Sequence, residues 1–389
     1  MTPGSVGTTT TEFFTFGSVD APFHLKSGEI LPEVTIAYET YGELTPEHDN
    51  AVLVFHALTG SQHAAGHNPS VPGVGERWTD ECQAGWWDRF IGPGKAIDTD
   101  RFFVITANYV GGCYGSTGPS SIDPRTGAPY GSRFPKVGFC DMVDTNIHLL
   151  EHLGIDRLHA VIGASTGGIM CLSLATRYPD MVDIVIPIAS GARLNSLQTL
   201  HNFEQIAAIQ SDPAFAGGDY YANEDQPDDG LALARMIGHK TFISLDFLEE
   251  RALTETPEGD GPGTYHIKNS LESYLWHQGR KFVGRFDANS YLVNMHAWQT
   301  YDLVLEAGVS DLTELFERSR NHHYMVFSID SDVCFYPDEQ EELSSHLKAA
   351  GVRYRHITVH SEKGHDSFLL EPRLYAPHLS DTLINPWHD

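Results

Sequence analysis

The feature that most constrains the fold is an alternation of short apolar segments, rich in β-branched residues, with amphipathic helical segments. This alternation is typical of a parallel sheet whose strands are joined by crossover helices. Several segments are almost entirely apolar, as is usual for strands covered on both faces. The pattern predicts an α/β protein with strands at 34–38, 51–56, 102–107, 159–163, 184–189, 324–329 and 356–360.

One long stretch interrupts the alternation. Between about residues 193 and 308 the pattern is helical and polar, with helices expected at 197–210, 230–250 and 271–282. Strand, helix and strand then resume. We interpret this as one core domain, formed by 1–192 and 309–389, that carries a helical lid domain at 193–308. Two independent domains fit the resumed pattern less well. The threonine run at 8–11 is expected to be a frayed end.

Charge and composition exclude several classes of function. The chain has 25 Lys and Arg against 52 Asp and Glu, a formal charge of −27. Such a surface repels phosphate backbones and anionic lipid, so neither nucleic acid nor a membrane is an expected partner. No signal peptide or spanning segment is recognisable, which predicts a cytoplasmic protein. The five cysteines are widely spaced without a CxxC pair, so neither a disulfide framework nor a metal site is expected.

The strongest chemical signal is the motif Gly-Ala-Ser-Thr-Gly around Ser165. The five-residue pattern G-x-S-x-G is weak on its own, because glycine-rich chains contain it by accident. Here it follows the apolar run HAVIG and precedes a segment with helical periodicity. A strand, a sharp turn and a helix in that order form a nucleophile elbow. We therefore predict that Ser165 is a covalent nucleophile.

A serine nucleophile requires a general base and an acid that orients the base. In this architecture the chain order is serine, acid, histidine. Asp332 follows the expected strand 324–329, and His365 follows the next one, so both are expected at the same sheet edge. Asp330 and Asp338 are rivals for the acid. Asp338 is expected to cap the following helix instead.

Two backbone N–H groups are needed to stabilise the oxyanion. Thr166, directly after the nucleophile, is expected to supply one, and Leu58 in the loop HALTG after an early strand the other. The glycine-rich segment 111–121 lacks the G-K-[ST] ending of a phosphate-binding loop. It is expected to form a wall where the backbone approaches the substrate.

With these motifs in place, the chain resembles the homoserine O-acyltransferases, a family with the α/β-hydrolase fold. The resemblance covers about residues 31–370. The segments that carry it, in chain order, are HALTG, WWDRFIGPGKAIDTDRFFVI, GGCYGSTGPSS, RFP with DMV, G-x-S-x-GG, DPAFAGGDYY, GLALARMIGHKT, KFVGRFDANSYL, SDVCF and GHD.

The resemblance implies a ping-pong acyl transfer from an acyl-CoA, without a bound cofactor, through an acyl-Ser165 intermediate. It further implies that Arg235 binds the α-carboxylate of an amino-acid acceptor and that Asp366 binds its ammonium group. A zwitterion entering a dry pocket needs an opposite charge at each end. The resemblance also implies a homodimer formed through the lid.

The chain departs from the family pattern in three places. Ala164 and Thr166 replace the usual residues beside the serine, Phe242 stands where a tyrosine is usual, and VNMHAWQTYD follows ANSYL. L-Homoserine O-acetyltransferase is the leading hypothesis. A serine or other amino-alcohol O-acetyltransferase or O-succinyltransferase is an alternative within the family. An esterase-like serine hydrolase and a non-catalytic binding protein are alternatives outside it.

Overall fold

The computed structural model describes residues 4–254 and 261–385. Its main feature is a mixed sheet with the strand order β1-β4-β6-β5-β7-β8-β9-β10. The pairs β1/β4 and β4/β6 are antiparallel, and all pairs from β6 to β10 are parallel. The strands are β1 (Glu12–Phe16), β4 (Val34–Tyr41), β5 (Ala51–Phe55), β6 (Phe103–Ala107), β7 (Leu158–Ala164), β8 (Val182–Ile188), β9 (His323–Ile329) and β10 (Arg353–Val359), with β2 (Phe23–His24) and β3 (Ile30–Leu31) forming a separate hairpin. The α/β prediction is confirmed.

Helices cover both faces of this sheet. The helices are α1 (Phe139–His152), α2 (Thr166–Arg177), α3 (Ser196–Gln210), α4 (Asp228–Phe242), α5 (Leu245–Ala252), α6 (Ser270–Val283), α7 (Ala288–Gln299), α8 (Leu303–Ala307), α9 (Leu312–Phe316), α10 (Pro337–Ala349), α11 (Ser367–Leu370) and α12 (Pro372–Ile384). Helices α1, α2 and α10 bury their apolar side chains in one core cluster, and α12 packs in a second cluster with Trp87 and Phe90. Strands β5, β7 and β8 lie between these layers and are nearly all apolar, as expected for doubly covered strands.

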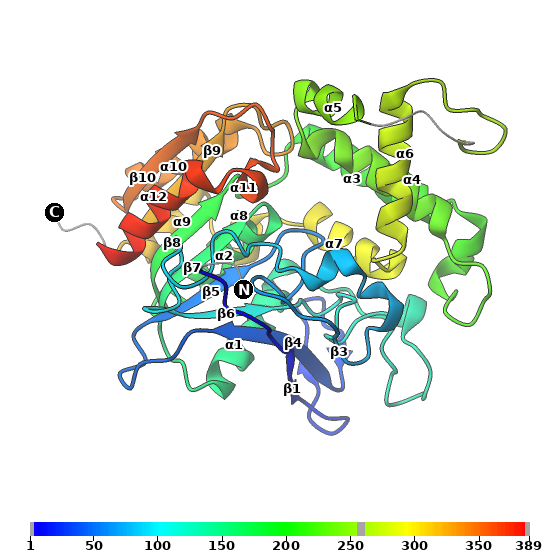
Figure 1. Cartoon of the computed structure of the whole chain (residues 1–389). Coiled ribbons are helices and arrows are strands. Elements are labelled where there is room, and N and C mark those ends of the chain that lie inside the picture. The colour runs from blue at the N-terminus through cyan, green and yellow to red at the C-terminus, as the bar shows by residue number, and fades with distance from the viewer. Residues whose placement is uncertain (1–3, 255–260, 386–389) are drawn as a thin grey trace.

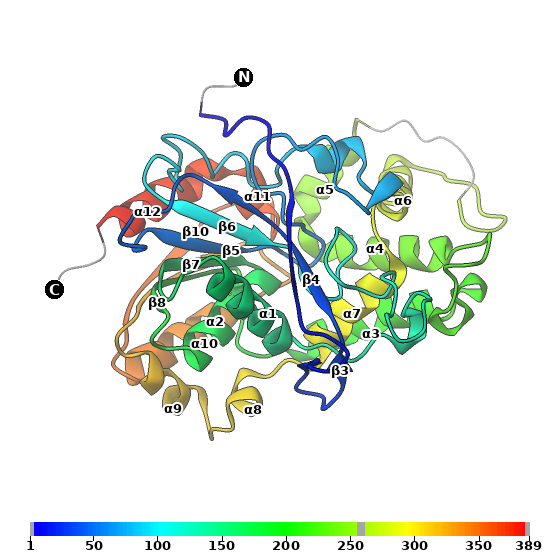
Figure 2. The same ribbon diagram turned by 90° about the horizontal axis from the view of Figure 1, so that it is seen from below.

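A helical insertion separates β8 from β9. Helices α3 to α6 gather at one end of the molecule, and α7 lies between them and the sheet (Figures 1 and 2). The helix expected at 230–250 is two helices, because Ile243 has an extended backbone and Ser244 caps α5 by accepting a hydrogen bond from the N–H of Phe247. In the described part of the chain, none of the helices has the length and apolar character needed to cross a membrane.

The threonine run near the N-terminus is not a frayed end, so that expectation is wrong. Thr8 forms a bridge with His67, and the N–H of Thr9 donates to the His67 carbonyl. Strand β1, which follows directly, then pairs over its whole length with residues Val34 to Tyr38 of β4. The threonine run is therefore held to the core on both sides, which its low complexity did not indicate.

The carboxylate of Glu39 in β4 holds this N-terminal segment to the core. Glu39 is buried, and its two oxygens accept hydrogen bonds from Thr11 at 2.9 Å, Asn68 at 2.7 Å, Tyr41 at 2.9 Å and His63 at 2.9 Å. All four partners donate, so the group is stable as a carboxylate. Burial alone would raise the pKa of Glu39, but these contacts outweigh it and the pKa lies below its usual value.

The partner of this carboxylate, His63, also lines a cleft that contains Ser165 and His365. Its Nδ1 faces Glu39 and its Nε2 lies 3.0 Å from the Gln83 carbonyl. The Glu39 carboxylate and the Gln83 carbonyl therefore hold the His63 ring at its two nitrogens, and the Thr9 hydroxyl lies 3.3 Å from Nδ1. This buried contact between Glu39 and His63 fixes the segment that follows β5 to strand β4.

Replacing Glu39 by Gln should lower the free energy of unfolding by about 3 kcal/mol, because it replaces a buried carboxylate that is hydrogen-bonded to four side chains by a neutral amide that cannot accept from all of them. The depressed pKa gives stability that is full above the unfolded value of 4.5 and is lost as the pH falls through the folded value. Urea unfolding between pH 7 and pH 3 measures both effects. The exposed variant Glu47→Gln is the control, with an expected change below about 0.5 kcal/mol. Equal stability of the two variants would contradict the interpretation.

Candidate active site

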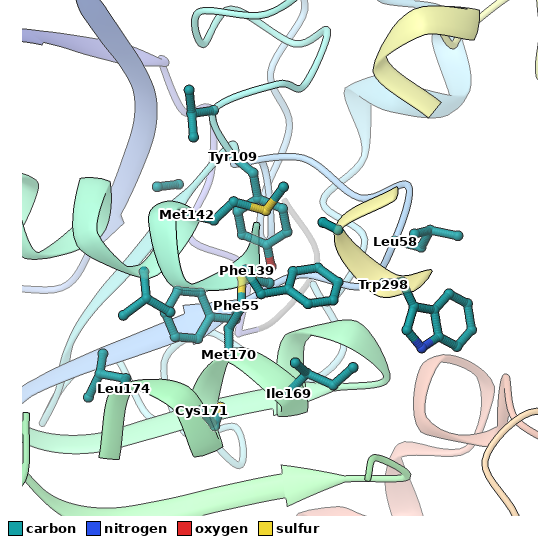
Figure 3. Packing of buried hydrophobic residues seen from close by; sticks show 14 of the residues in the cluster. Phe55, Leu58, Tyr109, Phe139, Met142, Ile169, Met170, Cys171, Leu174 and Trp298 are labelled. Atoms are coloured by element: carbon teal, nitrogen blue, oxygen red, sulfur yellow. The ribbon is translucent and has the colours of Figure 1, made fainter. Parts of the chain in front are cut away.

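Ser165 occupies a sharp turn between β7 and α2. Its φ of 59° and ψ of −128° are strained for a residue with a side chain, and it is the N-cap of α2. The turn is possible only because glycines surround it: a Cβ on Gly163 would overlap the Gly167 carbonyl, and one on Gly167 would overlap the Phe55 carbonyl. Figure 3 shows Phe55 among the apolar side chains that pack beside α2. The geometry is that of a nucleophile elbow.

Asp332 and His365 lie together at the same edge of the sheet. His365 Nδ1 is 2.6 Å from Asp332 Oδ2, and both side chains are buried. The other oxygen, Asp332 Oδ1, accepts from the N–H groups of Cys334 at 2.7 Å and Phe335 at 2.9 Å. These bonds fix the carboxylate, which in turn fixes the imidazole ring with a hydrogen on Nδ1.

The remaining nitrogen of His365 faces the cleft. Within the described chain, Nε2 is buried and has no hydrogen-bond partner. Burial alone would lower the pKa of His365, but the charge and hydrogen bond of Asp332 outweigh it, so the pKa lies above its usual value. Ser165 and His365 line the same cavity. An unprotonated Nε2 in this place can accept a proton from a reacting hydroxyl.

Asp330 and Asp338, the other candidates for the acid that orients the histidine, have different partners. Asp330 accepts from the ring of His360 at 2.8 Å and from the N–H of Ser361, away from His365. Asp338 does not cap α10, so that expectation is wrong: Tyr336 is the N-cap, and Glu339 accepts its N–H at 3.1 Å. Asp338 lies in the first turn, where its charge suits the helix dipole.

Leu58 and Thr166, the two predicted oxyanion donors, border the elbow. Thr166 is the first residue of α2, so its N–H has no acceptor within the helix. Leu58 lies in the loop after β5 and lines the cavity, and its carbonyl accepts from the side chain of Asn294 at 2.8 Å. The helix end and the loop therefore meet at Ser165.

The cavity above Ser165 has a volume of about 350 Å³ and contains both residues expected to bind an acceptor. Arg235 comes from helix α4 of the insertion, and Asp366 directly follows His365. Burial raises the pKa of Asp366 and lowers that of Arg235. Neither charged group makes a hydrogen bond or a close ion pair with any described residue, so both remain available to a ligand with two opposite charges.

Phe242, one of the expected departures from the family pattern, contacts Arg235 directly. The guanidinium lies over the Phe242 ring at 5.1 Å and over the Phe282 ring at 4.9 Å. Aromatic faces stabilise a cation without consuming its N–H donors. The Phe242 carbonyl also accepts the N–H of Asp366 at 2.8 Å, so this residue joins the two charged sites.

Sequence reasoning missed other residues of the cavity. Arg285 and Glu81 line it, and Arg285 donates to the Tyr114 hydroxyl at 3.0 Å and to the Thr59 carbonyl at 3.3 Å. Arg285 stands in the matched segment KFVGRFDANSYL, but only the fold shows what it contacts. The glycines of 111–121 do not form the expected wall. Gly111 packs against Val293 and Gly118 against Gly112, and within that segment Tyr114 alone lines the cavity.

Comparison with known proteins agrees with this geometry. Residues 50–372 match the family model described as the alpha/beta hydrolase fold. The chain is 42% identical to the homoserine O-succinyltransferase of Laribacter hongkongensis over 357 residues, which is 92% of this chain and 91% of that protein. It is 41% identical to the homoserine O-acetyltransferase of Solidesulfovibrio magneticus over 372 residues, 94% of this chain and 90% of that protein.

Solved structures agree as well. A homoserine O-acetyltransferase from Bacillus anthracis superposes with a TM-score of 0.85 at 27% identity, covering 96% of this chain and 97% of that one. A structure titled esterase E22 superposes with a TM-score of 0.84 at 26% identity, covering 96% and 100%. The identity and coverage of the sequence relatives decide the family. The chain belongs to the homoserine O-acyltransferases, enzymes of the α/β-hydrolase fold.

Proposed function

We propose that this enzyme is an acyl-CoA-dependent L-homoserine O-acetyltransferase that works through an acyl-Ser165 intermediate. The observation that carries the proposal is the pair of uncommitted opposite charges, Arg235 and Asp366, in the cavity that also holds Ser165 and His365. An α-amino acid presents one carboxylate and one ammonium group, which these two side chains match. A simple hydrolase would need neither charge.

In the first half-reaction, Ser165 Oγ attacks the thioester carbonyl while His365 Nε2 accepts the hydroxyl proton. The C–O bond forms, and the negative charge on the former carbonyl oxygen is stabilised by the N–H groups of Leu58 and Thr166. Collapse of this intermediate breaks the C–S bond. His365 returns the proton to the departing sulfur, so free CoA thiol and acyl-Ser165 result.

In the second half-reaction, the acceptor hydroxyl replaces the CoA thiol. Arg235 binds the carboxylate and Asp366 the ammonium group, which directs the hydroxyl of the side chain toward the acyl carbon. His365 removes the hydroxyl proton, the new ester bond forms, and the bond to Ser165 breaks with the proton returned to its oxygen. Asp332 stabilises the imidazolium in both halves.

The charges of the cavity support an acetyl rather than a succinyl donor. A succinyl group ends in a carboxylate, so its binding requires a cationic side chain without another partner. An acetyl group carries no charge and requires none. Arg285 is already engaged by Tyr114 and Thr59, and its Nε lies 3.9 Å from Glu81. Among the described lining residues this leaves Arg235 as the uncommitted arginine, and the acceptor requires it.

We also propose that 193–308 acts as a lid domain on the core formed by 1–192 and 309–389, and that two copies associate through it. Helix α3 exposes Leu197, Leu200 and Phe203, and the neighbouring α4 exposes Leu233. A gathered apolar surface of this kind on a soluble domain supports association, and the lid position fits a second copy of the same chain.

The function is tested by following thiol release from acetyl-CoA and succinyl-CoA with homoserine, with serine or without an acceptor. We expect release from acetyl-CoA that depends on homoserine, and an acetyl group on Ser165 when the acceptor is omitted. Faster turnover with serine would point to the serine acyltransferase alternative. Acceptor-independent release would support the hydrolase alternative, which the similarity to esterase E22 keeps open.

Two variants separate donor chemistry from acceptor binding. Arg235→Met and Asp366→Asn should each raise the KM for homoserine by about 100-fold, since each removes one charge-assisted contact. Acetylation of Ser165 by acetyl-CoA should persist, as intact-protein mass spectrometry would show. Arg280→Met, an exposed arginine on α6 paired with Asp229, is the matched control. A KM unchanged in both site variants would contradict the assignment.

The pH dependence of kcat/KM tests the base. His365 must be unprotonated to accept a proton, and its raised pKa places the rise in activity above pH 6.5. Asp332→Asn should move this rise to lower pH and reduce kcat by about 10⁴-fold. Asp330→Asn is the matched control and should leave the profile unchanged. A profile equally altered by both variants would contradict the assignment of Asp332.

The oligomeric state is tested by light scattering at micromolar concentration, where we expect twice the chain mass of 43.1 kDa. The double variant Leu200→Lys and Phe203→Lys should give the monomer mass, because it places charges in the proposed interface. Leu305→Lys, also at an exposed position but on α8, should remain dimeric. A wild-type monomer would contradict the proposal.

A further inference from the structure

The loop after β5 is held in place by hydrogen bonds to its backbone carbonyls. Four consecutive carbonyl oxygens, those of residues 56–59, each accept a side-chain hydrogen bond. The donors, in order, are the Tyr109 hydroxyl, the Nδ1 of His56, the Nδ2 of Asn294 and the Nη1 of Arg285. The first two belong to the core and the last two to the lid insertion. Because these carbonyls are hydrogen-bonded within the protein, the opposite side of each peptide unit carries the N–H group, which can face a ligand.

We propose that Asn294 on lid helix α7 is a positioning residue that sets the orientation of the Leu58 N–H in the oxyanion hole. The inference rests on the proposed function, in which Leu58 stabilises the oxyanion. Asn294 touches no substrate atom in this scheme, and acts only through the Leu58 carbonyl.

The geometry of a peptide explains the effect. Leu58 lies between two rigid peptide planes, and its N–H shares the first plane with the Ala57 carbonyl, pointing the opposite way. That carbonyl accepts from His56 Nδ1 at 2.7 Å and from the N–H of Gly60 at 3.0 Å. Asn294 holds the second plane through the Leu58 carbonyl at 2.8 Å. With both planes fixed, the Leu58 backbone cannot rotate its N–H away from the oxyanion.

The bond is directional and contributes little to stability. The Leu58 carbonyl can only accept, so the amide nitrogen of Asn294 must face it. The amide oxygen, Oδ1, is then buried without a partner in the described chain. Leaving such an acceptor unpaired costs about as much as the one hydrogen bond gains. The expected effect of Asn294 is therefore on the geometry of the loop rather than on unfolding.

Helix α7 also reaches the other half of the site. Trp298, one turn after Asn294 and on the same face, stacks on Phe335 at 5.4 Å, and Phe335 stacks on the His365 ring at 5.5 Å. Trp298 and Leu58 lie at the same edge of the cluster drawn in Figure 3. Asn294 and Trp298 both fall in VNMHAWQTYD, the segment that departs from the family pattern. This face of α7 thus supports the oxyanion loop and the base together.

The test compares two asparagines of the same helix. Asn289 is also buried, and its Nδ2 donates to the Gly218 carbonyl at 2.8 Å, outside the cavity. In Asn294→Leu, the rate of Ser165 acetylation by acetyl-CoA should fall about 10- to 100-fold with the KM for acetyl-CoA unchanged, because only transition-state stabilisation is lost. Asn289→Leu should keep the wild-type rate. Thermal unfolding of both variants reports stability separately.

Acetylation by p-nitrophenyl acetate is measured in parallel, because it uses the same serine and oxyanion hole without CoA or an amino acid. If wild type reacts with the ester but not with acetyl-CoA, the proposed function fails while the role of Asn294 is still tested. Equal acetylation rates in the two variants, with either substrate that reacts, would overturn the proposal. Should the leucine variants fail to fold, Asn294→Ala and Asn289→Ala give the same comparison.

Discussion

The site depends on the close approach of strand β7 to helix α2. A Cβ on Gly163 would overlap the Gly167 carbonyl, one on Gly167 the Phe55 carbonyl, and one on Gly168 the side chain of Ser190. This contact forces Ser165 into a backbone conformation that side chains rarely adopt, and the surrounding core keeps it there. The strain places the serine oxygen at the helix N-terminus, where an oxyanion is stabilised. The other groups of the site are arranged around this fixed point.

Around Ser165, some charged side chains are paired within the protein and others have no close partner. The buried carboxylate of Glu39 is bonded to His63, and that of Asp332 accepts from two backbone N–H groups and contacts His365. Such pairs fix loops but cannot bind a ligand strongly. Arg235 and Asp366 are left without close partners in a confined cavity, where an interaction between charges is stronger than in water. These two unpaired charges support an acceptor that carries both a carboxylate and an ammonium group, and they do so more directly than the fold does.

Much of the fold and of the candidate site could be predicted from the sequence, and the predictions that were wrong or missing have physical causes. The elbow, the acid–base order and the parallel strands follow from local patterns, since apolar runs and turn residues determine them. Strand β1 was missed because it is short and pairs at the edge of the sheet with β4, which lies later in the chain, so no local pattern reveals it. The break at Ile243 and the glycine contacts at 111–121 depend on packing between distant segments. The roles of Arg285 and Asn294 require the lid to be placed against the loop after β5, which lies more than 200 residues earlier in the chain.

The position of the helical insertion between β8 and β9 has a consequence for synthesis of the chain. Translation produces the proposed nucleophile Ser165 and the loop after β5 first, then the helices of the insertion, and only afterwards Asp332 and His365. While the chain is on the ribosome, an early β-sheet can form with the serine in place but without its base. Under the proposed mechanism, Ser165 therefore gains its acid and its base only after β9 and β10 have been added to the sheet.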